Sequence, residues 1–168
     1  EGGATMKNIE KDPSAAILGG YIEPTRVINT VHRTTLAHHP DPYDPTPTNG
    51  ISSYYGEMIY GDVGFAIIAD RQWKSGPERI NIEVGVTGQD EDKFSYNPKF
   101  NPPGLELLGK RQEDFLVQWG KNWDGHSLKA VLSQTVFAGI CTHQPTPDRF
   151  MKYDFDSSGW PASARNRA

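Results

Sequence analysis

The sequence has a single cysteine, Cys141, which excludes an internal disulfide framework and a cysteine-based zinc site. No apolar run approaches the roughly 20 residues that a transmembrane helix needs, so we expect no membrane span. A basic excess is also missing: the formal charge is −4, which argues against a nucleic-acid-binding surface. The glycine motifs of nucleotide-binding loops, the G-x-S-x-G nucleophile elbow and the H-E-x-x-H metal motif are absent as well.

The residues that are present indicate a globular chain rich in loops. Hydrophobic residues make up 36% of the 168 positions and charged residues 23%, which suffices for a packed core. The 17 glycines and 13 prolines predict long irregular segments. Pro161 begins a short terminal helix that has room for about two turns, and such a helix is marginal unless it packs. We therefore expect the chain to be an internal part of one domain, the alternative being a frayed tail.

Hydrophobic patterning divides the chain into five segments. Four prolines in residues 40–47 prevent both a helix and a central strand there. The segments are a loop-rich opening with a short helix starting near Pro24 (1–50), strands (51–73), a long insertion with a possible strand over 80–86 (74–104), a helix followed by a strand (105–135), and a loop with a truncated helix (136–168).

The strand signals predict an α/β fold. SYYGEMIY over 53–60 and the apolar run over 63–69 flank Gly61-Asp62, which predicts a hairpin. The run over 63–69 and a second apolar run over 128–132 are expected to be buried strands. Between them, 105–123 shows a helical period and a wet face that includes Arg111. Strand, insertion, helix and strand form a βαβ unit, so we expect a mostly parallel sheet with helices on its faces.

The best candidate site lies where the two apolar strands end. Asp70-Arg71 follows the first of these strands and Ser133-Gln134 the second. If the strands are neighbours, both pairs converge at the sheet edge where open α/β sheets bind ligands. The alternative is a structural pair, in which Arg71 satisfies carbonyl groups and Asp70 caps a turn.

Other chemistry-bearing residues allow two interpretations. His38 and His39 are interpreted as a surface loop pair. The alternative is that one faces the interior and one solvent, because neighbours on an extended chain point opposite ways. Cys141 is interpreted as a small buried hydrophobe rather than a nucleophile. Five aromatic residues could line a sugar-binding face or pack in the core: Tyr43, Tyr54, Tyr55, Tyr60 and Trp73.

Several stretches together resemble a known enzyme family. They are PDPYDPTP over 40–47, YGDVGFAIIADR over 60–71 with KSGP over 74–77, the segment from Leu108-Gly109 to VLSQT over 131–135, and DSSGWP over 156–161 with Arg165. These stretches are similar to the PhoD-like metallophosphatases, the alkaline phosphatase D group of the calcineurin-like phosphoesterase superfamily. The long runs are specific, each short piece alone is not, and together they span nearly the whole chain.

The resemblance implies a layered α/β/β/α metallophosphoesterase that hydrolyses phosphate esters with a metal-activated water. The parent enzyme would use calcium, iron, zinc or manganese ions and would be exported to the periplasm or the cell exterior. The family's metal-binding motifs lie before and after the region that matches, and Gln134 stands where many relatives have a metal-binding histidine. Gln is a poor ligand for a transition metal, so we expect this chain alone to bind no metal and to be inactive.

The site predicted from these arguments consists of active-site wall residues. Asp70, Arg71 and Gln134 are the catalytic-wall candidates, and His39 and Trp160 are the candidates for the substrate-binding rim. The expected partner is a phosphate-ester substrate, while the oligomeric state is left open. The rival hypotheses are a carbohydrate-binding module and a non-catalytic structural domain in which Asp70 and Arg71 simply pair.

Overall fold

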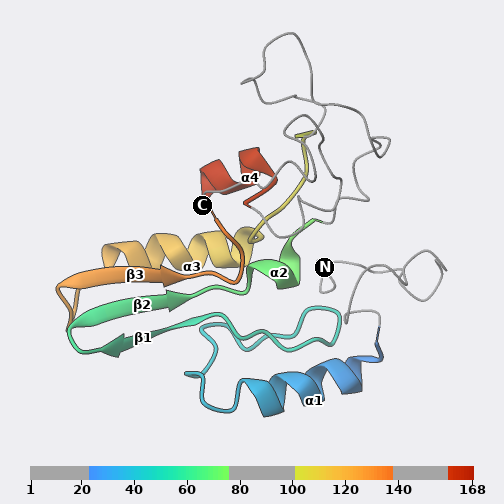
Figure 1. The fold of residues 1–168 in the computed structure, drawn as a ribbon, viewed down its shortest axis with the longest axis horizontal. Helices are drawn as coiled ribbons and strands as arrows, with labels where there is room; N and C mark the ends of the chain where they lie inside the picture. The colour runs from blue at the N-terminus through green and yellow to red at the C-terminus, as the bar shows by residue number, and fades with distance from the viewer. Residues whose placement is uncertain (1–22, 76–100, 138–158) are drawn as a thin grey trace, which may run out of the picture.

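The computed structural model describes residues 23–75, 101–137 and 159–168, and the predictions for 80–86 and Cys141 lie outside these ranges. The described residues form a mixed α/β arrangement in which a long helix covers one face of a small sheet (Figure 1). The layered α/β/β/α architecture that the resemblance implies stays a prediction. The elements are α1 (Thr25–Thr35), β1 (Gly56–Tyr60), β2 (Val63–Ile67), α2 (Asp70–Trp73), α3 (Lys110–Lys121), β3 (Leu128–Leu132) and α4 (Ala162–Arg167).

The first two strands form the predicted hairpin. β1 pairs antiparallel with β2, and Tyr60 faces Val63 across a two-residue turn. Gly61 and Asp62 have φ angles of 57° and 66°. Positive φ at both central residues is the type I′ geometry, whose twist matches that of the flanking strands. This turn is confirmed, although β1 starts at Gly56 rather than at residue 53.

The third strand completes the predicted βαβ unit. β3 pairs parallel with β2 from Val63 opposite Leu128 to Ile67 opposite Leu132. Ile68 continues the ladder, since its amide donates to the Leu132 carbonyl at 3.0 Å. The strand order is β1-β2-β3, with one antiparallel and one parallel pairing among the described strands. The sheet is therefore mixed rather than mostly parallel.

Burial of the strands is one-sided, which corrects the sequence prediction. In β2, Gly64 and Ala66 are buried, while the alternate residues keep part of their surface. β3 contains no buried residue, and Leu132 is 45% exposed. The reason is that α3 covers a single face of the sheet (Figure 1) and β3 lies at its edge among the described strands. An apolar run alone does not reveal which face is covered.

Helix α3 begins later than its apolar period suggests. Gly109 immediately before it has a φ of 74°, which a right-handed helix cannot contain. Leu105, Leu107 and Leu108 are buried in the preceding loop, and the last two pack with Ile68 and Ala164. Trp123, the last residue of the helical period over 105–123, follows the end of the helix and is 54% exposed.

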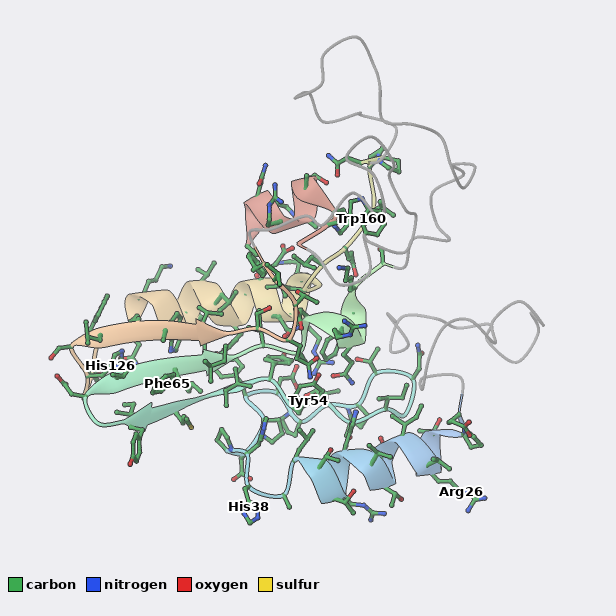
Figure 2. The ribbon with its side chains drawn as sticks, in the orientation of Figure 1. Arg26, His38, Tyr54, Phe65, His126 and Trp160 are labelled. Carbon is green, nitrogen blue, oxygen red and sulfur yellow. The ribbon has the colours of Figure 1, made fainter. Side chains whose placement is uncertain are left out.

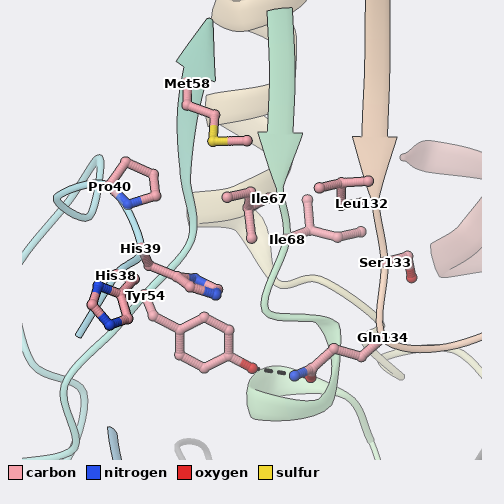
Figure 3. A pocket seen from close by; sticks show the side chains of 10 residues that line it. All are labelled: His38, His39, Pro40, Tyr54, Met58, Ile67, Ile68, Leu132, Ser133 and Gln134. Atoms are coloured by element: carbon pink, nitrogen blue, oxygen red, sulfur yellow. Dashed lines mark hydrogen bonds between the residues drawn. The ribbon is translucent and has the colours of Figure 1, made fainter. Parts of the chain in front are cut away.

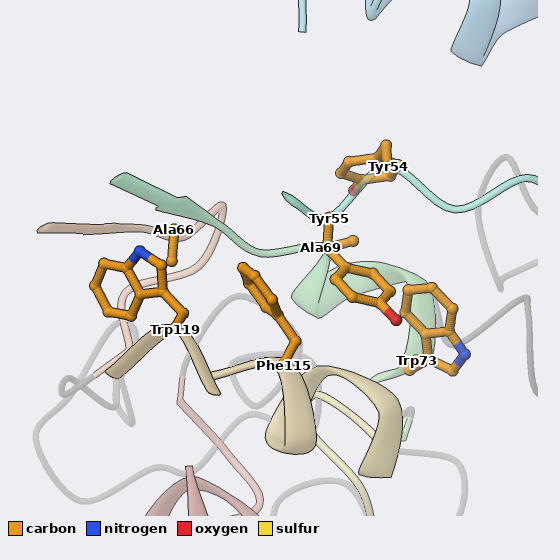
Figure 4. Close-up of a cluster of buried hydrophobic side chains, with 7 residues drawn as sticks. All are labelled: Tyr54, Tyr55, Ala66, Ala69, Trp73, Phe115 and Trp119. Atoms are coloured by element: carbon orange, nitrogen blue, oxygen red, sulfur yellow. The ribbon is translucent and has the colours of Figure 1, made fainter. Parts of the chain in front are cut away.

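The main core cluster lies between the sheet, α2 and α3. Figure 4 shows it as an aromatic row from the loop before β1 to α3. The Tyr55 ring stands edge-on to Trp73 at 5.7 Å between centroids. Edge-to-face aromatic pairs add to the stabilisation that comes from burying their area. The buried members are Tyr54, Tyr55, Ala66, Ala69, Trp73, Phe115 and Trp119.

The proline-rich segment over residues 40–47 packs over this core. The Tyr43 ring lies 4.8 Å from that of Phe115. Arg111, predicted to face water, instead bonds the Asp44 carboxylate at 2.7 Å and the Thr48 hydroxyl at 2.8 Å. The Arg111 guanidinium also lies over the rings of Tyr55 and Trp73, so a residue of α3 fastens the segment to the core.

The two terminal helices of the described chain are confirmed. α1 follows Pro24 and buries Ile28, and its Asn29 side chain accepts from the Ser52 amide at 2.9 Å. α4 follows Pro161 and buries Ala164, which packs in the leucine cluster before α3. The short α4 is thus stabilised by tertiary packing.

Candidate functional site

Asp70 connects the ends of the two parallel strands. It begins α2, after Ile68 and Ala69 have followed the end of β2, and its side chain has no exposed surface. Its Oδ2 atom accepts hydrogen bonds from the Ser133 hydroxyl at 2.8 Å, from the Thr135 amide at 3.0 Å and from the Thr135 hydroxyl. Its Oδ1 atom accepts the Arg71 amide at 3.0 Å. The predicted convergence of the two strand ends is therefore confirmed for Asp70 and Ser133.

The convergence follows from strand direction. Since β2 and β3 run parallel, their carboxyl ends meet at one edge of the sheet. A buried carboxylate is costly unless several donors satisfy it. The Asp70 carboxylate has such donors, and this network fixes the backbone after β3 relative to α2.

Two cationic side chains belong to the same short helix and its end. Arg71 is half-buried, and burial lowers the pKa of its guanidinium, which still remains protonated. Lys74 has no exposed surface. Burial lowers the pKa of the Lys74 ammonium to about 7; the Asp70 carboxylate opposes this shift and the Arg71 charge adds to it. The short helix and its end therefore carry one buried carboxylate, one half-buried guanidinium and one buried amine.

A cavity of about 370 Å³ opens beside this network. Figure 3 shows it between the ends of β2 and β3 and the loop before β1. The Tyr54 hydroxyl donates to the Gln134 Oε1 atom at 3.0 Å across it. Ser133 belongs both to the cavity wall and to the Asp70 network. The lining residues are His38, His39, Pro40, Tyr54, Met58, Ile67, Ile68, Leu132, Ser133 and Gln134.

The structure brings together most of the predicted site residues. Gln134 and His39 are exposed and line the cavity, and the His39 ring lies 6.5 Å from that of Tyr54. His38 is exposed and lines the cavity too, which agrees with the interpretation of the pair as surface loop residues. Trp160 lies elsewhere: its side chain is completely buried before α4, away from Tyr54 in Figure 2.

Sequence reasoning missed three members of the site. Lys74 was noted only within the KSGP segment over 74–77, and Thr135 only as the last residue of the VLSQT segment over 131–135. Tyr54 was considered only as a core or sugar-binding ring. Neighbouring residues of an extended segment point to opposite sides, so Tyr54 and Tyr55 could have been predicted to have different surroundings. In the structure the Tyr54 hydroxyl bonds Gln134 and the Tyr55 ring packs on Trp73.

The described residues do not fit a bound metal ion. No group of three or more His, Cys, Asp or Glu side chains comes together within residues 23–75, 101–137 and 159–168. Both Asp70 oxygens accept protein hydrogen bonds. His38 and His39 line the cavity, but no carboxylate is among the described residues that line it, His32 on α1 bonds the Ser52 hydroxyl at 2.8 Å, and His126 lies at the far, hairpin end of the sheet (Figure 2). Burial lowers the pKa of the His32 imidazole.

The aromatic residues considered for sugar binding are divided between core and surface. Tyr54, Tyr55 and Trp73 belong to the buried cluster. Tyr43 and Tyr60 are 51% and 77% exposed, at opposite ends of β1 and its preceding loop. The five rings therefore do not form one exposed face.

No family model, curated protein or solved structure matches this chain. The resemblance to the PhoD-like phosphatases consequently stays a prediction. Within the described parts of the chain, no helix has the length and apolar character needed to cross a bilayer.

Proposed function

We propose that this chain forms one wall of the active site of a phosphate-ester hydrolase, with the carboxyl ends of β2 and β3 holding the phosphate group. The observation that carries the proposal is the Asp70–Ser133 hydrogen bond of 2.8 Å, which joins the two strand ends beside Arg71. Ligands of open α/β sheets bind outside the carboxyl ends of the strands. The resemblance to the PhoD-like phosphatases supports the same reaction class and an exported protein.

The chemistry of the wall suits a phosphate group. A guanidinium can bind two phosphate oxygens through parallel N–H donors, and such charge-assisted bonds strengthen as charge develops in the transition state. Arg71 is assigned this role. Asp70 holds the helix that carries Arg71, through its hydrogen bonds to Ser133 and Thr135. The Gln134 amide offers further donors.

Activation of the attacking water is not assigned to this wall. The described residues do not gather a metal-binding group. Any metal ions in the natural protein would therefore be held by other residues, and they would polarise water and phosphate oxygens. The described residues bind and orient the ester.

The test is hydrolysis of 4-nitrophenyl phosphate and of bis(4-nitrophenyl) phosphate by the product of the whole natural gene. Arg71→Ala is expected to lower kcat/KM about tenfold to a hundredfold, the equivalent of a charged hydrogen bond. Arg71→Lys should recover only part of this loss, because Lys lacks the planar fork. Arg26→Ala, which removes an exposed arginine of α1, is the control.

Each outcome has a distinct meaning. If the wild-type protein hydrolyses neither ester, the proposed reaction class is wrong. If it hydrolyses one and the kinetics of Arg71→Ala are unchanged, Arg71 and Asp70 are structural. The ester that is turned over identifies the natural class as monoester or diester.

A further inference from the structure

The cavity beside the phosphate wall has an apolar floor. Met58 of β1, Ile67 at the end of β2 and Leu132 at the end of β3 form this floor together with Ile68 (Figure 3). Among the described residues that line the cavity, none is Asp, Glu, Lys or Arg. A charged group would lose hydration there without gaining an Asp, Glu, Lys or Arg partner of opposite charge.

One side of the cavity is aromatic. The His39 and Tyr54 rings stand edge-on at 76°, and the Met58 thioether lies across the cavity from them in Figure 3. Aromatic edges and thioether sulfur are favourable neighbours for a further ring. The Tyr54 hydroxyl is engaged by Gln134 Oε1, which leaves the Gln134 amide N–H groups outside that bond. A ring carrying one oxygen would therefore find both apolar contacts and a donor.

The cavity adjoins the proposed phosphate site through a shared residue. The Ser133 hydroxyl bonds Asp70 at 2.8 Å, and Ser133 also lines the cavity. A volume of about 370 Å³ lies at the small end of ligand pockets. That size suits one or two rings rather than a long acyl chain.

We propose that this cavity binds an uncharged aromatic group, namely the alcohol portion of the phosphate ester that the wall holds. The claim that an aromatic group binds is based on the cavity alone. The claim that this group is part of the substrate rests on the proposed function. The resulting substrate class is an ester between phosphate and a phenol-type or aryl-bearing alcohol.

The binding test uses 2-naphthol as the probe and needs no hydrolysis. The protein is labelled with 13C at its methionine methyl groups, and Met58→Leu identifies the Met58 resonance. Saturable movement of that resonance on titration is expected. Leu132→Asn, which places an amide in the floor, should weaken binding about tenfold, a loss typical of a disturbed apolar contact.

Leu128→Asn is the matched control. Leu128 lies four residues before Leu132 on β3 and therefore on the same face, but it does not line the cavity. Both leucines are already exposed, at 63% and 45%, so both variants should fold; Met58→Gln, at a position 37% exposed, is a second floor variant. Naphthol affinity should be unchanged in Leu128→Asn and reduced in both floor variants.

Two results would overturn the proposal: no saturable binding, or equal losses in Leu128→Asn and Leu132→Asn, which would indicate general adhesion to the open sheet face. A failure of the proposed function would give a different result from a failure of this proposal. In that case naphthol binds with the expected variant pattern, while the natural protein hydrolyses no phosphate ester.

Discussion

Replacing Asp70 should destabilise the fold more than replacing any exposed acidic residue. Asp70→Ala deletes the acceptor of two Thr135 donors and of the Ser133 hydroxyl. Thr135 is 6% exposed and Asp70 is completely buried, so water does not readily replace the lost acceptor. Each hydrogen bond to a charged group contributes about 1.5–3 kcal/mol, but neighbouring bonds are not additive. A buried donor left unsatisfied costs about 1–3 kcal/mol, and Asp70→Ala strands several, so a loss of about 3–5 kcal/mol is expected here.

Equilibrium urea unfolding followed by tryptophan fluorescence measures this effect, since Trp73 and Trp119 are buried. Asp70→Asn keeps the shape but loses the charge, and it gives a graded variant if Asp70→Ala does not fold. Thr135→Val removes one hydroxyl donor and should cost about 1–2 kcal/mol. Asp41→Ala, at an exposed position, should leave the free energy of unfolding unchanged. An Asp70→Ala protein within about 1 kcal/mol of wild type would refute the reasoning.

Three further predictions concern stability. The pKa of Lys74 is lowered to about 7 in the folded state, so the unfolded chain binds more protons above that pH. The stability of wild type relative to Lys74→Met should therefore rise from pH 7 towards 10 in urea titrations, by at most about 1.4 kcal/mol per pH unit, and a flat difference would contradict the burial. Gly64→Ala should lower the thermal midpoint by overpacking, at a cost of about 1–3 kcal/mol, because its Cβ would lie 2.5 Å from the His126 ring. Gly120→Ala, where nothing lies within 4 Å of the added Cβ, should raise that midpoint. Arg111→Lys should cost about 1–3 kcal/mol in urea unfolding, since the lysine loses the fork that bonds Asp44 and Thr48, and equal stability would show that the fork is dispensable.

Local signals predicted the elements that local chemistry determines. Gly61-Asp62 between two apolar runs is sufficient for a type I′ hairpin, because few residues adopt positive φ. The meeting of Asp70 with Ser133 followed from strand direction alone, once an intervening helix made the strands parallel. Pro24 and Pro161 correctly marked the starts of α1 and α4.

Features that depend on distant partners were not predictable in this way. The leucines before Gly109 fit the helical period of α3, but the positive φ of Gly109 prevents the helix from extending back to them. Leu107 and Leu108 pack in a separate cluster instead. Arg111 looks like a surface residue until Asp44, 67 positions away, is placed beside it. The burial of Lys74 likewise depends on tertiary packing, which no pattern of its neighbours encodes.

The central claim is that the strand ends beside Asp70 hold a phosphate group through Arg71. Calorimetric titration of this chain with inorganic phosphate at low ionic strength tests it most directly, with Arg71→Ala and Arg26→Ala as the paired variants. We expect saturable binding that weakens about tenfold to a hundredfold in Arg71→Ala and is unchanged in Arg26→Ala. Absence of saturable binding, or equal affinity in wild type and Arg71→Ala, would contradict it.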